Sequence, residues 1–79
     1  MKNVIRQQLG RLEQQEMEFD ELVIRMRGIF GTKNIDIFHD YINGSYLFVP
    51  YGGFIKGVFR VYFNIVNKKL FVAQICEIS

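Results

Sequence analysis

Apolar residues recur at alternating steps of four and three along the first thirty residues of the chain. With Glu16 as one polar interruption, the series consists of Ile5, Leu9, Leu12, Phe19, Val23, Met26 and Phe30. This spacing puts the apolar side chains on one stripe of an α-helix, and the segment is rich in helix-favouring Gln, Glu, Arg, Leu and Met. The pattern predicts one continuous helix over about residues 3–28, with Gly28 or Gly31 supplying its C-cap.

A second interpretation of this segment stays open. Gly10 and the polar run at residues 13–16 are weak points in a helix. A break near residues 18–20 would let Asp20 cap a second helix.

The rest of the chain has the composition of a β-sheet. Of the twelve aromatic residues in the whole chain, ten follow residue 31, and aromatic residues favour strands. Alternating residues predict strands at about 34–42, 46–49, 56–65 and 70–77. Asn43-Gly44 is a strong signal for a two-residue hairpin turn. Residues 34–42 also fit a helix by the spacing of their apolar positions, and the hairpin signal favours the strand.

The predicted fold is therefore α+β, with one long N-terminal helix packed on a four-stranded, mostly antiparallel β-meander. The sheet is expected over about residues 34–77, and residues 1–79 are expected to form a single domain. With 79 residues, the chain is close to the size at which a single core becomes marginal.

Alternation along the strands suggests that both faces of the sheet carry apolar residues. Phe59, Val61, Phe63 and Ile65 define the face expected to meet the helix. One helix covers only one face of a sheet. A helix of about 26 residues is also about 39 Å long, against about 33 Å for a ten-residue strand, so its first turns should overhang the sheet.

Exposed apolar surface of this extent indicates an interaction site. The interface predicted for a second copy of the chain, or for another protein, consists of Ile5, Leu9 and Leu12 on the overhang and Val58, Tyr62, Leu70 and Val72 on the second sheet face. The alternative is that the helix bends at Gly10 or Glu16 and packs its first turns onto its own sheet.

Composition excludes several kinds of chemistry. One Cys and one His rule out a disulfide framework, a multi-cysteine zinc site and a His-rich metal site. His39, between Asp36 and Asp40, is interpreted as a solvent-facing residue near a hairpin, and Cys76 as a small apolar strand residue. No catalytic, cofactor-binding or metal-binding residue is predicted. No stretch is apolar enough to predict a membrane span, and residues 1–8 do not have the apolar core expected of a signal peptide. With the free Cys76, a cytosolic location is expected.

The leading functional hypothesis is a small, non-enzymatic, homodimeric interaction module. The alternative is a nucleic-acid-binding protein, because residues 56–79 carry a charge of +3 while the whole chain carries +2. The residues predicted for that patch are Lys56, Arg60, Tyr62, Lys68 and Lys69. A third hypothesis is a minimal RNA-cleaving, toxin-like enzyme that uses Lys56, Arg60 and a Tyr.

Overall fold

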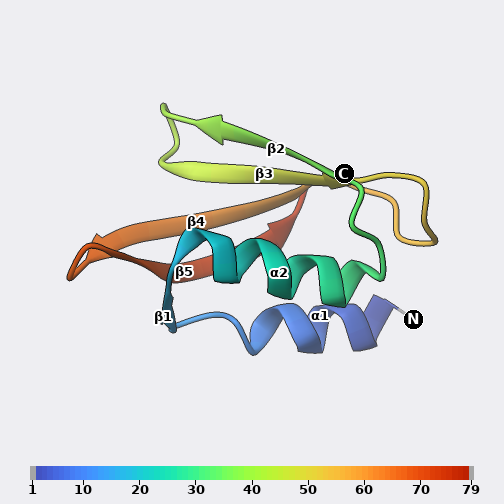
Figure 1. Cartoon of the computed structure of the whole chain (residues 1–79), viewed down its shortest axis with the longest axis horizontal. Helices are drawn as coiled ribbons and strands as arrows, with labels where there is room; N and C mark the ends of the chain where they lie inside the picture. The colour runs from blue at the N-terminus through green and yellow to red at the C-terminus, as the bar shows by residue number, and fades with distance from the viewer. Residues whose placement is uncertain (1, 79) are drawn as a thin grey trace.

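A computed structural model describes residues 2–78, and within them two helices pack on a five-stranded antiparallel sheet (Figure 1). The elements are α1 (Lys2–Gly10), β1 (Glu16–Met17), α2 (Phe19–Phe30), β2 (Ile35–Asp40), β3 (Ser45–Pro50), β4 (Phe59–Val66) and β5 (Lys69–Glu77). The strand order is β1-β5-β4-β3-β2, so β1 and β2 are the two edges. The predicted α+β class is confirmed, whereas the single long helix and the four-stranded sheet are wrong.

The predicted long helix is interrupted because residues 13–17 run along the outer edge of β5. Glu16 and Met17 pair with Phe71 and Leu70. Two backbone hydrogen bonds continue this pairing along β5. The Gln14 N–H donates to the Val72 carbonyl at 2.6 Å, and the Val72 N–H donates to the Gln15 carbonyl at 2.9 Å. The polar run that weakens the helical pattern thus pairs with the sheet.

The second helix begins two residues earlier than the sequence suggests. Glu18, rather than Asp20, is the N-cap, with extended backbone angles. Gly31 ends the helix as predicted, since its φ of 69° is left-handed and its N–H donates to the Arg27 carbonyl at 2.9 Å.

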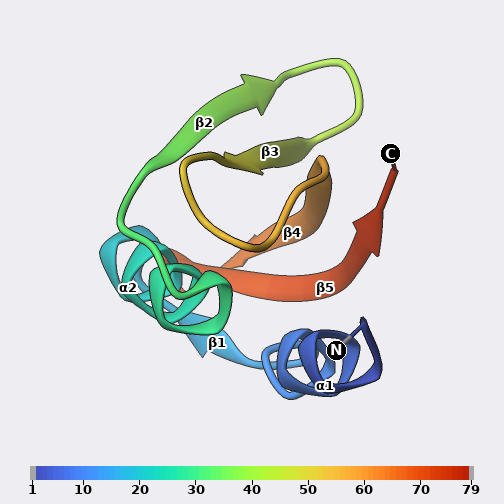
Figure 2. The same cartoon turned by 90° about the vertical axis from the view of Figure 1, so that its right-hand side faces the viewer.

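The apolar stripe of the first thirty residues is buried in two pieces. α1 and α2 run in opposite directions (Figure 1), and Figure 2 shows both on the same side of the curled sheet. Leu9 is 6% exposed and Leu12 is 3% exposed, and both pack in the core with Leu22, Met26 and Phe30. The predicted overhang is therefore wrong, and the alternative with the first turns folded back is confirmed.

A β-bulge on β5 changes the predicted face assignment. Tyr62 pairs with Gln74 while Phe63 pairs with Val72, so Ala73 is one extra residue on β5. An extra residue exchanges the two faces of a strand. Leu70 and Val72 consequently point towards the helices, at 6% and 0% exposed, and their predicted place on the second sheet face is wrong.

The predicted β2–β3 hairpin is present, but its turn is longer than expected. Asp40 pairs with Ser45, which leaves four residues, 41–44, in the loop. The two-residue turn occurs instead between β4 and β5, where Asn67 and Lys68 have φ values of 53° and 66°.

Gly28 inside α2 and Gly31 at its C-cap provide a test of the helix and its end. Gly28 lies inside the helix, and a Cβ added there would meet nothing within 4 Å. We expect Gly28→Ala to raise the free energy of unfolding by about 0.5–1 kcal/mol, measured by urea denaturation. Gly31→Ala should lower it by about 1 kcal/mol, because alanine is strained at positive φ. Equal effects of the two substitutions would contradict these assignments.

Candidate functional site

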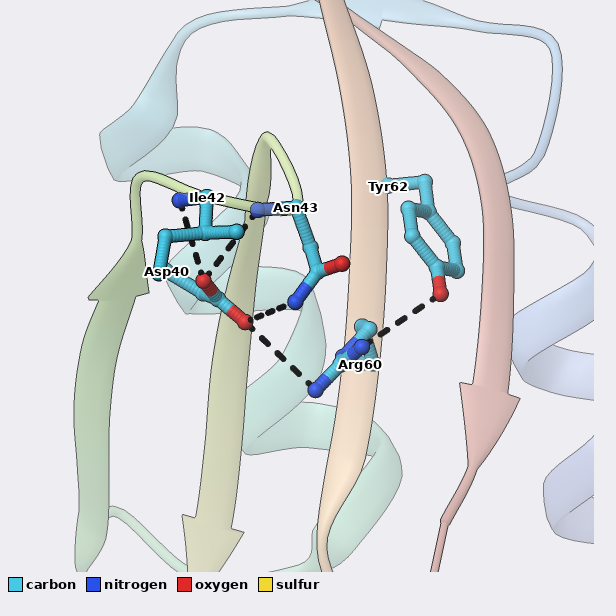
Figure 3. A network of polar contacts seen from close by, with 5 residues as sticks. All are labelled: Asp40, Ile42, Asn43, Arg60 and Tyr62. Atoms are coloured by element: carbon cyan, nitrogen blue, oxygen red, sulfur yellow. Dashed lines mark hydrogen bonds and ion pairs between the residues drawn. The ribbon is translucent and has the colours of Figure 1, made fainter.

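The sheet has one face that points away from both helices, here called the helix-free face. Strand register aligns Phe38, Leu47, Arg60 and Cys76 in one row across β2, β3, β4 and β5. The neighbouring row consists of Asp40, Ser45, Tyr62 and Gln74. Within residues 2–78 no helix lies over these rows, and in Figure 3 α2 lies behind the strands that carry them while α1 lies to the side of β5.

A polar network occupies the centre of this face (Figure 3). Arg60 Nη2 lies 3.5 Å from Asp40 Oδ2, and Arg60 Nη1 donates to the Tyr62 hydroxyl at 3.5 Å. The guanidinium carbon is 5.8 Å from the centroid of the Tyr62 ring. The side chains of Arg60 and Asp40 are each 20% exposed. The positive charge of Arg60 is therefore balanced within the face itself.

Asp40 also organises the turn that follows β2. Its Oδ1 accepts hydrogen bonds from the backbone N–H groups of Ile42 and Asn43 at 3.2 Å each. Its Oδ2 accepts one from Asn43 Nδ2 at 2.7 Å. The Asn43 side-chain and backbone hydrogen bonds, and then the charge of Arg60, hold the pKa of Asp40 below its usual range.

The pKa of Arg60 lies above its usual range, first because its guanidinium is hydrogen-bonded to Tyr62 and then because it is near Asp40. Asp40 and Arg60 are therefore both charged at neutral pH. The Asp40 carboxylate links the 41–44 turn to the start of β4.

Apolar side chains surround this network. Phe38 is 54% exposed, and Leu47 and Val49 are half-buried. The 41–44 turn adds Ile42 at 95% exposure, whereas the ring of Tyr41, which is 83% exposed, lies against His39 on the helix side. An exposed patch of this kind, with its charges paired, has the character of a protein contact surface.

The structure separates the residues predicted for a protein interface. Tyr62 lies on the helix-free face and Val58 directly precedes β4, and both are half-buried. Ile5 is half-buried on α1, away from them. The other four predicted residues, Leu9, Leu12, Leu70 and Val72, are in the core.

Phe38 and Leu47 were missed by the sequence reasoning. The signal that could have found them is the alternation of residues 35–40 combined with the hairpin at Asn43-Gly44. Together these place Phe38 on the same face as Asp36 and Asp40.

The residues predicted for a nucleic-acid interface are also separated. Arg60 and Tyr62 are adjacent, but Arg60 is paired with Asp40. Lys56 precedes β4, whereas Lys68 and Lys69 follow it. The strand between them is roughly 23 Å long at about 3.3 Å per residue. The predicted single basic patch is therefore not formed.

His39 and Cys76 lie on different faces of the sheet. His39 joins an aromatic cluster on the helix side, with its ring centroid 4.0 Å from Tyr41 and 4.7 Å from Tyr46. Cys76 is half-buried opposite Arg60. In the described part of the chain, no three His, Cys, Asp or Glu side chains form a group that could hold a metal ion.

Comparison of the chain with protein-family models, with curated proteins and with solved structures gave no match. Neither helix within residues 2–78 combines the length and hydropathy required to cross a membrane.

The Asp40 network predicts a pH-dependent contribution to stability. A carboxyl group whose pKa is lower in the folded state stabilises the fold when ionised, and this stabilisation is lost as the pH falls below about 4. Asp40→Asn should therefore lower the free energy of unfolding at pH 7, and the difference from the unmodified chain should shrink at pH 3. Urea denaturation at both pH values measures this difference.

Asp36→Asn is the matched control, because Asp36 lies on the same strand and face but has no ion pair within residues 2–78. At pH 7 its effect on the free energy of unfolding should be smaller than that of Asp40→Asn. A pH-independent effect of Asp40→Asn would contradict the role of the network.

Proposed function

We propose that this protein is a small interaction module that forms a homodimer through its helix-free face. The observation that carries the proposal is the row Phe38–Leu47–Arg60–Cys76. In this row the Phe38 side chain is 54% exposed, and the charge of Arg60 is paired with Asp40 of the same chain. Burial of such a surface against another protein is favourable, because its apolar atoms leave water without leaving a charge unpaired.

A second copy is the partner that suits the charge of this face. Arg60 and Asp40 neutralise each other, so the face offers no surplus of positive charge to a nucleic acid. A two-fold contact places the same patch on both subunits and therefore requires a face without strong net charge. The apolar row meets that requirement.

The size of the chain agrees with this proposal. A standard protein interface buries about 800 Å² per partner, which is roughly a seventh of the 5305 Å² accessible surface of this chain. Burial of that area adds substantially to the small core of a chain this short. Dimer formation and folding stability are therefore expected to be coupled, and the cytosolic location expected from the sequence belongs to the same proposal.

Nucleic-acid binding and RNA cleavage remain predictions from the sequence. Arg60, the residue on which both depend, is engaged with Asp40 and Tyr62. We therefore do not propose either as a second function.

The dimer is tested by light scattering on the purified chain at several concentrations. We expect a mass of twice 9.3 kDa at high concentration. Phe38→Glu should give 9.3 kDa at the same concentrations, because it places a charge in the contact. Unfolding by urea would show that the variant is folded.

Ile24→Glu is the matched control, since Ile24 is 64% exposed on α2, which lies on the other side of the sheet. This variant should remain dimeric. A 9.3 kDa species at all concentrations of the unmodified chain would refute the proposal, as would equal effects of the two substitutions.

A further inference from the structure

A groove of about 690 Å³ lies between α1 and the loop at residues 51–58. Figure 2 looks onto this end of the molecule, with the loop and α1 on either side of β5. The α1 wall includes Ile5, Arg6 and Gly10, the loop wall includes Phe54 and Lys56, and Ile75 on β5 also lines the groove. The volume is in the range of pockets that bind small ligands or a few residues of a peptide.

The outer edge of β5 is partly open inside this groove. Residues 14–17 pair with β5 as far as Val72. Two side chains then continue the ladder: Gln14 Nε2 donates to the Ala73 carbonyl at 3.0 Å, and Glu13 Oε2 accepts the Ile75 N–H at 2.8 Å. Glu13 thus binds the edge where the carbonyl of a neighbouring strand would bind.

Beyond Glu13 the chain turns away into α1, and the edge continues without it. Alternate residues of a strand present their backbone groups to the same edge. The Ile75 carbonyl and the Glu77 N–H and carbonyl therefore follow the Ile75 N–H on this side. Within residues 2–78 no strand pairs with β5 at these positions on that side. This short edge can receive an extended backbone.

The charges on the two walls favour a carboxylate. Arg6 and Lys56 are exposed on opposite walls, and the ion pairs found in residues 2–78 involve neither of them. The carboxylate of Glu13 is already bonded to Ile75. Glu77 on β5 is an exposed carboxylate that also lines the groove. The two cations of the walls therefore outnumber the one carboxylate of the described lining that is not hydrogen-bonded.

Phe54 adds an apolar contact that the chain itself does not use. It lines the groove and is 95% exposed. Ile5 and Ile75, both half-buried, lie at the edge of the core. An apolar side chain placed among these three residues would leave water on several sides.

We propose that this groove binds a short extended peptide of a partner protein, which adds as a strand beside the end of β5. An apolar side chain of the peptide contacts Ile5, Phe54 and Ile75, and a carboxylate of the peptide lies between Arg6 and Lys56. The groove shares Gln74 and Cys76 with the helix-free face. Its α1 wall and its 51–58 loop wall lie outside that face, so this inference does not rest on the proposed homodimer.

A displayed library of random heptapeptides with free C-termini, selected on the full-length chain, tests the proposal. We expect enriched peptides to combine an apolar residue with a carboxylate one or two positions away. The affinity of one enriched peptide is then measured by fluorescence anisotropy. N-methylation of one set of alternate amides should abolish binding, while N-methylation of the other set should not, because a strand donates from alternate residues only.

Variants of the walls locate the peptide. Arg6→Gln with Lys56→Gln should weaken binding about tenfold or more, whereas Arg27→Gln with Lys68→Gln, which removes two charges outside the groove, should not. Gly10→Leu should also weaken it, because a side chain at this position enters open space in the groove. Urea denaturation checks that each variant is folded.

The proposal is overturned if no peptide is enriched, or if the enriched peptide binds the groove variants and the unmodified chain equally. It is also overturned if dodecanoate binds as tightly as the peptide and N-methylation has no effect, since an amphipathic acid would then suffice. The mass measured by light scattering decides the homodimer independently of these results.

Discussion

Hydrogen bonding to the outer edge of β5 determines the course of the chain over residues 2–18. Backbone N–H and C=O groups at the side of a core strand must be paired or solvated. Residues 13–17 pair with that edge, first through their backbone and then through the side chains of Gln14 and Glu13. A continuous helix over this segment would bury the same apolar stripe but would leave the edge without these partners.

This interruption also positions the rest of the molecule. It allows α1 to return beside α2, so that Leu9 and Leu12 join the core. It ends the β5 pairing early, which leaves the groove between α1 and the 51–58 loop. Both helices lie on one side of the sheet, so no helix covers the opposite face. On that face Phe38 is exposed, and Leu47, Arg60 and Asp40 are partly exposed.

Much of the local structure could be read from the sequence, because it depends on near neighbours. The apolar stripe, the Gly31 cap and the β2–β3 hairpin are such features. The continuous helix was favoured over a break, because the apolar spacing continues through residues 11–18 and the pairing with β5 that causes the break is distant in sequence. The bulge at Ala73 has the same kind of cause, and it moved Leu70 and Val72 from the expected surface into the core. For the candidate site, alternation correctly placed Arg60 and Tyr62 together, whereas the pairing of Arg60 with Asp40 depends on the register of three strands.

The acidic residues of β2 bear on how this sheet behaves at high concentration. β2 is an edge strand six residues long, and such edges can template the growth of fibrils. If two β2 strands met antiparallel with Phe38 opposite Phe38, Asp36 of each would face Asp40 of the other, and like charges directly opposite are unfavourable. The exposed Phe38 is thus flanked by carboxylates that disfavour pairing between two β2 edges.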